Sequence, residues 1–232
     1  MKVAIIPARI GSKRIPKKNI KIFFNKPIIY WVIQTVKATK IFDKIIVSTD
    51  SEKIRAIARK YKVDSPFLRP KKISDDKTGI IEVVRHTILW LNKNNIKPNY
   101  VCCVLPTAIF VSPKHIISAY KKIKYKKWNY VFAAALFENS PLRSFQKNSK
   151  NGIKMLFPKN YNKRAQDLQQ CFYDVGQFYW GRISSWLKRI PIFGKNSTVI
   201  LLSNEKALDI DTKKDWLKAI KLWKKRKINF KE

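Results

Sequence analysis

The chain has 232 residues, a length that suits one α/β domain, alone or with a modest appendage. Hydrophobic residues make up 45% of it and seven residues are Trp, which is enough to bury a core and excludes a wholly disordered chain. The two His, His86 and His115, lie far apart in the sequence and argue against a His-rich zinc site. Three Cys without a Cys-x-x-Cys pair argue against a disulfide framework and fit a reducing cytosol.

The charge is strongly positive, because 50 Lys and Arg stand against 15 Asp and Glu, which gives +35. A nucleic-acid-binding module is the first interpretation of such a charge. The basic residues are spread along the whole chain and occur with many Ile and Asn, which indicates a compositional bias and a solvated surface. We therefore expect no nucleic-acid partner and keep that module as the alternative from a different functional class.

We expect neither a targeting segment nor a membrane span. The first apolar run is short and is interrupted by Pro7 and Arg9, unlike the apolar core of a signal peptide. No run of about 18 apolar residues occurs anywhere in the sequence. These patterns predict a cytoplasmic protein without a membrane partner.

Apolar runs and helical periodicities alternate over the first 136 residues. We predict, in chain order, a strand at 2–6, a helix at 27–40, a strand at 44–50, a helix at 52–61, a short strand at 66–68, a helix at 79–91, a strand at 100–106, a helix at 113–124 and a strand at 130–136. Strands without polar alternation, separated by helices, are typical of a parallel sheet covered on both faces. Ligands bind outside the carboxyl ends of such strands, which here are followed by residues 7–19, 48–50, 106–110 and the loop after 136.

The pattern changes after about residue 137. Residues 138–180 contain Pro, Asn and Gln with short β-like pieces, which predicts an antiparallel insertion of the kind that often reaches a partner subunit. A buried strand at 198–202 and a helix at 212–227 follow, the helix with Trp216, Leu217, Ile220 and Trp223 facing inward. We interpret 1–232 as a single domain with 138–180 inserted.

The basic loop PARIGSKRIPKKN, residues 7–19, directly follows the first predicted strand. Its backbone N–H groups can surround phosphates, and its Lys and Arg can neutralise their charge. The spacing matches neither a Walker loop nor GxGxxG. The simpler alternative is a basic turn in a basic protein.

Asp209 and Asp211 alternate in the sequence ALDIDT, so on an extended segment both carboxylates face the same side. Two hard oxygen ligands on one side suit Mg²⁺ shared with substrate phosphates. The alternative is that Asp211 or Thr212 only caps the last helix, which does not account for Asp209.

Two further segments carry weaker signals. Residues 68–79 place polar groups before a helix, where they can contact a base or ribose, although Asp75 and Asp76 can equally cap that helix. Residues 164–181 combine amides, carboxylates and aromatic rings, a composition that suits a sugar-binding wall. An amphipathic strand in an interface is the competing interpretation of that second segment.

Together these motifs resemble the acylneuraminate cytidylyltransferase family, the enzymes that activate nine-carbon acidic sugars. The resemblance rests on PARIGSKRIPKKNI, IIVSTDS, FLRP with DDKTG, QDL with YDVGQFYWG, and DIDT, and it covers nearly the whole chain. The Thr-Gly pair after the two Asp and the stretch GQFYWG resemble the members that act on pseudaminic acid. The resemblance implies a three-layer α/β/α Rossmann-like nucleotidyltransferase fold, with a mostly parallel sheet and a small β-rich insertion at 138–180 for dimerisation and sugar binding.

The implied reaction transfers CMP from CTP to the anomeric hydroxyl of a nonulosonic acid, releasing pyrophosphate, and supplies a CMP-sugar for glycan or flagellin glycosylation. Pseudaminic acid is the favoured substrate, with N-acetylneuraminate or legionaminate as the alternative. The resemblance also implies a homodimer and a requirement for Mg²⁺. Carried onto matching positions, the implied roles are catalytic for Lys18, Arg9 and Asp211; nucleotide-binding for Ala8, Arg9, Gly11, Ser12, Lys18, Asn19, Arg69 and Thr78; sugar-binding for Gln166, Asp167, Asp174, Gln177 and Tyr179; and metal-binding for Asp209 and Asp211.

This sequence departs from the family pattern in two regions. Ile10 stands where the family usually has Gly, and a β-branched residue does not easily take a positive φ, so either the backbone is ordinary there or the loop is altered. Leu105 precedes Pro106-Thr107 where sialic acid enzymes have a sugar-binding Gln, and Phe110 or Val111 stands near the place of an Arg in those enzymes. Leu105 in place of that Gln argues against N-acetylneuraminate as the substrate, and the missing Arg bears on the substrate assignment more than on the reaction.

Overall fold

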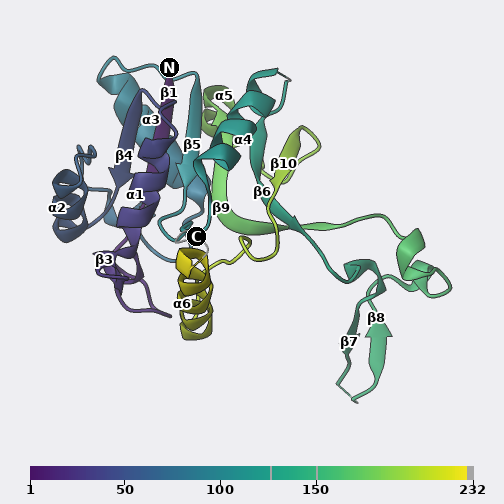
Figure 1. The fold of residues 1–232 in the computed structure, drawn as a ribbon. Helices are drawn as coiled ribbons and strands as arrows, with labels where there is room; N and C mark the ends of the chain where they lie inside the picture. Colours follow the sequence, from purple (N-terminus) through teal and green to yellow (C-terminus); the bar gives the residue numbers. More distant parts are fainter. Residues whose placement is uncertain (126, 150, 229–232) are drawn as a thin grey trace.

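A computed structural model describes residues 1–125, 127–149 and 151–228 and contains a central six-stranded sheet in the order β10-β6-β9-β5-β1-β4 (Figure 1). The strands are β1 Lys2–Pro7, β4 Lys44–Ser48, β5 Tyr100–Val104, β6 Tyr130–Leu136, β9 Phe172–Arg182 and β10 Ser197–Leu201. All neighbouring pairs are parallel except those made by β9, which is antiparallel to both β5 and β6. The sheet is therefore mostly parallel, as predicted.

Helices cover both faces of the sheet. They are α1 Ile28–Ala38, α2 Glu52–Lys60, α3 Ile80–Lys93, α4 Pro113–Tyr125, α5 Ile183–Leu187 and α6 Lys213–Ile228. Along β1, Ala4 and Ile6 join one core with α1, α4 and α6, while Val3 and Ile5 join a second core with α3 and α5. This follows from the alternation of side chains along a strand. The three-layer α/β/α fold class is confirmed. Among the described residues, no helix combines the length and apolar character needed to cross a bilayer.

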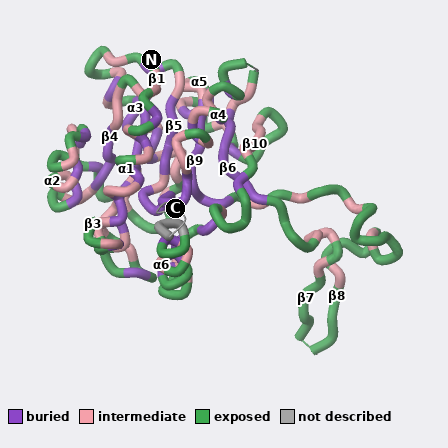
Figure 2. Tube along the Cα trace, in the orientation of Figure 1, coloured by how far each residue is buried: buried purple, intermediate pink, exposed green. Residues whose placement is uncertain are grey.

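The inserted segment is shorter than predicted. Residues 138–149 and 151–171 leave the sheet and form an exposed arm that ends in a hairpin of β7 Phe145–Lys147 and β8 Ile153–Met155 (Figures 1 and 2). Residues 172–180, which we also expected in the insertion, instead belong to β9. Strand β9 is buried from Val175 to Gly181. A strand in the centre of a sheet that is covered on both faces is expected to be mostly apolar, which accounts for the residues in this stretch.

Helix α6 is buried through Trp216, Ala219 and Trp223; the rings of Trp216 and Trp223 contact Phe23, and Trp223 also contacts Trp31 of α1. The inward orientation predicted for Leu217 is wrong, because this side chain is 61% exposed. Positions 216, 219 and 223 repeat at helical spacing, and a residue directly after 216 points about 100° away from that face. A second small hairpin, β2 Ile22–Phe23 with β3 Lys26–Pro27, lies between β1 and α1.

Candidate active site

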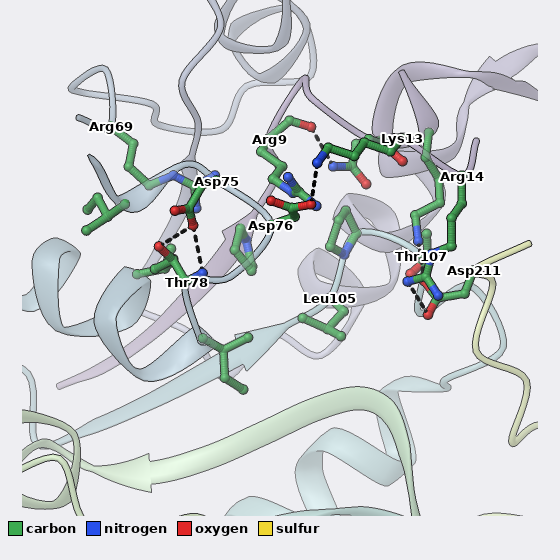
Figure 3. Close-up of a pocket in the computed structure, with 18 of the residues that line it drawn as sticks. Arg9, Lys13, Arg14, Arg69, Asp75, Asp76, Thr78, Leu105, Thr107 and Asp211 are labelled. Atoms are coloured by element: carbon green, nitrogen blue, oxygen red, sulfur yellow. Dashed lines mark hydrogen bonds and ion pairs between the residues drawn. The ribbon is translucent and has the colours of Figure 1, made fainter. Parts of the chain in front are cut away.

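A cavity of about 640 Å³ opens at the carboxyl ends of β1 and β5 (Figure 3). Its walls come from the loop after β1, the loop after β5, the segment before α3 and the segment before α6. The charged residues in its lining are five cations and four acids, namely Arg9, Lys13, Arg14, Lys18, Arg69, Asp75, Asp76, Asp209 and Asp211. Two of the predicted strand ends therefore line it, whereas the residues after β6 enter the arm.

The basic loop is fixed to the end of β4 by its main chain. Ala8 N donates to Ser48 O over 2.9 Å, and Ile10 N donates to a carboxylate oxygen of Asp50 over 2.9 Å. Ile10 is not among the residues with positive φ, as its β-branched side chain requires. The loop takes its left-handed turn at Lys17 instead, with φ 52°. The replacement of Gly at position 10 is thus compatible with an ordered loop.

The basic loop and the acidic segment meet at Asp211. Lys18 Nζ lies 2.9 Å from Asp211 Oδ1 and also donates to the carbonyl of Ile210 over 2.6 Å. Arg14 Nη2 lies 2.7 Å from Asp211 Oδ2. The side chain of Lys18 is 16% exposed and that of Asp211 34%, so this pair is partly shielded from water and its charges interact more strongly than those of surface pairs, whereas Arg14 is 66% exposed.

Asp209 and Asp211 both line the cavity, while Ile210 between them is fully buried. The predicted alternation is confirmed. The Asp209 carboxylate faces the cavity, but the surrounding protein wall and the neighbouring charge of Asp211 raise its pKa to about 6. The nearby Lys18 ammonium opposes this rise.

The start of α6 is capped without Asp209 or Asp211. Asp215 accepts hydrogen bonds from Thr212 N at 2.7 Å and Asp211 N at 3.1 Å, and its own N–H donates to Thr212 Oγ1. This reciprocal arrangement is a capping box, which satisfies the first N–H groups of a helix. Thr212 therefore caps the helix, as the alternative allowed, but Asp211 does not, and both carboxylates line the cavity.

Arg69 and Thr78 lie on the opposite wall of the cavity (Figure 3). Arg69 is 5% exposed and donates from Nε to Ser74 Oγ over 3.1 Å. Burial lowers its pKa, and the nearby charge of Asp50 opposes this effect. Thr78 is held by Asp75, which accepts from its N at 2.7 Å and from its Oγ1 at 2.6 Å.

Asp75 and Asp76 form no side-chain cap on α3, whose N-cap is Gly79. Asp76 instead lies 2.7 Å from Lys13 Nζ and connects the segment before α3 to the basic loop. The role of Arg14 beside Asp211 was also not assigned from sequence. The Lys13–Asp76 and Arg14–Asp211 pairs each join residues that are far apart in the chain. The one sequence signal for such pairs was the high density of charged residues in each segment.

The five predicted sugar-binding residues do not line this cavity in the single chain. Gln166 and Asp167 lie on the arm, and Gln166 lines a second hollow at its base. Gln177 and Tyr179 are buried in β9, with exposures of 1% and 4%. Asp174 is exposed and accepts a hydrogen bond from the Tyr179 hydroxyl at 2.6 Å. Neither buried side chain offers a surface to a sugar.

The remaining nucleotide-binding predictions lie on the basic loop. Ala8 is fully buried, and Asn19, 6% exposed, donates from Nδ2 to Arg9 O over 2.8 Å. Ser12 lines the cavity, whereas Gly11 does not. A Cβ added at Gly11 would meet nothing within 4 Å, so the loop does not need glycine there for space.

The donor set suits a divalent cation held jointly with a substrate. The described residues contain no group of three or more His, Cys, Asp or Glu arranged for a metal ion. Asp209 and Asp211 nevertheless place two hard oxygen donors on one cavity wall, and Mg²⁺ is commonly bound by one or two carboxylates plus substrate phosphates. The repulsion that raises the pKa of Asp209 is also relieved by a cation between the two.

The sheet is mostly parallel, a cation-rich loop follows its first strand, and an acidic pair lines the same cavity. This combination is typical of α/β proteins that bind nucleotide phosphates. The chain belongs to the cytidylyltransferase family, whose sequence model matches residues 3–225.

Individual relatives agree with this membership. The chain is 38% identical to pseudaminic acid cytidylyltransferase of Campylobacter jejuni, covering 92% of both chains. It is 28% identical to N-acylneuraminate cytidylyltransferase of Escherichia coli, over 97% of this chain and 52% of that one. In fold it is similar to a CMP-2-keto-3-deoxy-manno-octonic acid synthetase structure in complex with CTP, with a TM-score of 0.74 and 13% identity over 97% and 99% of the two chains.

Proposed function

We propose that this chain transfers CMP from CTP to the anomeric hydroxyl of pseudaminic acid in the cytoplasm. The hydroxyl oxygen attacks the α-phosphorus and its proton is released to water, the bond from that phosphorus to the oxygen bridging the β-phosphate breaks, and pyrophosphate leaves. The choice of sugar is supported by the higher identity to the Campylobacter pseudaminic acid enzyme than to the Escherichia coli N-acylneuraminate enzyme.

The observation that carries this proposal is the convergence of Lys18 and Asp211 in one cavity. It places cations that suit a triphosphate directly beside carboxylates that suit a divalent cation. A module that only binds nucleic acid needs the cations but has no use for the acidic pair.

In the proposed complex, Arg9, Ser12 and Lys18 hold the triphosphate, with main-chain groups of Ala8 and Gly11 shaping the loop. Lys18 offsets the negative charge that develops as the bond to pyrophosphate breaks. The cytidine lies against the wall formed by Asn19, Arg69 and Thr78.

Asp209 and Asp211 would hold Mg²⁺, which supplies charge neutralisation and orientation of the phosphates when bound. Arg14 and Lys18 keep the Asp211 carboxylate on the cavity wall through contacts of 2.7 and 2.9 Å.

We include a homodimer in the proposal because the arm exposes apolar side chains. Phe145, Ile153 and Tyr161 are 60%, 64% and 71% exposed. A two-stranded hairpin is marginally stable alone, and an exposed apolar surface of this kind marks a contact with another chain. In a dimer, the arm of the partner subunit would bring its own Gln166 and Asp167 to the sugar, while Asp174 remains a candidate within the chain.

The reaction is tested by incubating the purified chain with CTP, Mg²⁺ and, separately, pseudaminic, legionaminic, N-acetylneuraminic and 3-deoxy-manno-octulosonic acids. Pyrophosphate release is expected with pseudaminic acid first. Turnover of none of the four sugars contradicts the proposed reaction, and N-acetylneuraminate reacting well ahead of pseudaminate contradicts the substrate assignment alone.

A further inference from the structure

Strand β9 is irregular beside the acidic segment. Phe132 of β6 pairs with Tyr179, but Ala134 pairs with Asp174, so β9 carries extra residues between these two pairs. Gly176 within this stretch has a φ of 56°. Such β-bulges are frequent next to active sites, where they redirect a side chain out of the regular ladder. Here the bulge lies next to the segment that carries Asp209.

Gln177 in this bulge holds the main chain of the acidic segment. Its Nε2 donates to Leu208 O over 2.8 Å, and the residue is only 1% exposed. Its Oε1 has no hydrogen-bond partner among the described residues. Because burying an amide is unfavourable without such bonds, the contact with Leu208 is the polar interaction that accounts for a Gln here.

The main chain of Gln177 also contacts the end of the neighbouring strand β5. Its carbonyl accepts a hydrogen bond from Leu105 N over 2.8 Å, and Leu105 lines the cavity at the end of β5. One buried residue therefore connects the β5 end of the cavity to the segment before α6.

Because Gly176 has no side chain, the Asp209 carboxylate can occupy the space beside its main chain. A Cβ at position 176 would lie 2.8 Å from Asp209 Oδ2, closer than real Cβ contacts, and φ 56° is a conformation that side chains other than Gly rarely adopt. The carboxylate thus rests against the main chain of the bulge, one residue from the contact between Gln177 and Leu208.

We propose that Gln177 and Gly176 are positioning residues that hold the Asp209 carboxylate at the place where it serves the divalent cation. Gln177 acts through Leu208 and contacts no substrate, which replaces the sugar contact expected for it from sequence. The inference rests on the proposed function, since it assigns these residues to the metal-binding part of that site. Groups that orient metal ligands typically change metal affinity or activity by about 10- to 100-fold when they are replaced.

The test is CTP binding by calorimetry to the full chain, with Mg²⁺ and with EDTA. The parent chain is expected to bind CTP more tightly with Mg²⁺. Gln177→Leu keeps the side-chain volume but loses the donor, so its affinity in EDTA should match that of the parent, while the gain from Mg²⁺ should shrink about tenfold. Gly176→Ala disturbs the same carboxylate from the other side and should lose the gain as well.

Trp180→Phe is the matched control. Trp180 lies on the same strand, is fully buried, and donates from Nε1 to Ile116 O over 3.0 Å, so its replacement removes a similar bond away from the acidic segment. This variant is expected to keep the full gain from Mg²⁺, even where its melting temperature falls. A full gain in both Gln177→Leu and Gly176→Ala, or an equal loss in Trp180→Phe, overturns the inference.

The failure of the proposed function gives a different result. In that case the parent chain itself shows no pyrophosphate release with any sugar acid and no effect of Mg²⁺ on CTP binding. A parent chain that reacts and responds to Mg²⁺, together with unchanged Gln177→Leu and Gly176→Ala variants, contradicts only the positioning role.

Discussion

Lys18 and Asp211 are 193 positions apart in the sequence, yet Lys18 Nζ lies 2.9 Å from Asp211 Oδ1. This contact joins the loop after β1 to the segment before α6 and closes one side of the cavity. The same carboxylate also pairs with Arg14, whose Nη2 lies 2.7 Å from Asp211 Oδ2. The position of Asp211, a proposed ligand of the divalent cation, therefore depends on two cations of the basic loop.

Asp211→Asn is expected to lower the rate of pyrophosphate release by orders of magnitude while the chain stays folded. The substitution keeps the shape of the side chain but removes the charge that the metal and Lys18 require. Steady-state rates at saturating CTP and sugar acid, with circular dichroism for the fold, measure this. Asp64→Asn is the control, because Asp64 forms an exposed pair with Lys44 outside the cavity. Near-normal turnover of Asp211→Asn removes Asp211 from the metal site.

Lys18→Met should reduce kcat by about 10²- to 10³-fold, the loss typical of removing one group that stabilises developing charge. Lys17→Met makes the same charge change at the adjacent, exposed position, which does not line the cavity, and should leave kcat nearly unchanged. A comparison of the two in kcat, with CTP saturating, separates a local contact from the general positive charge. Equal losses in both variants argue for the general charge.

Asp209→Asn is expected to stabilise the metal-free chain while it abolishes turnover. The folded pKa of about 6 exceeds the ordinary value of 3.8, so the folded state binds the proton more tightly than the unfolded state does. The stability that the protonated Asp209 carboxyl contributes is therefore lost as the pH rises from about 3.8 to about 6, and the loss is complete above the folded-state pKa. Asn avoids this loss because it does not ionise.

Melting temperatures in EDTA check this prediction at two pH values. At about pH 8 the Asp209→Asn variant should melt higher than the parent, and near pH 4 the difference should be small, because the parent carboxyl is then protonated in the folded state. A variant that melts lower at both values shows that Asp209 contributes favourable contacts in the metal-free chain instead.

The fold class and the local alternation of the acidic pair followed from the sequence, whereas contacts between distant segments did not. The alternation of Asp209 and Asp211 could be read locally, because a two-residue period in an extended segment is enough to place both on one side. The position of Gln177 could not, because its partner Leu208 lies 31 positions away and its surroundings read equally well as an exposed sugar wall. The predicted inward orientation of Leu217 was wrong because Leu217 directly follows the buried Trp216, and helical spacing turns it away from the buried face.

The arm provides the last prediction, on the oligomeric state. Phe145→Glu combined with Ile153→Glu places charge on two exposed apolar positions of the hairpin and should convert a dimer into a monomer in sedimentation experiments. Gln146→Glu is the matched control, since consecutive strand residues point to opposite faces and Gln146 is also exposed. If the arm also completes the sugar site, the double variant should raise KM for the sugar acid while CTP binding stays unchanged. A double variant that remains dimeric, or a parent chain that is monomeric, contradicts the assignment of the arm to the dimer contact.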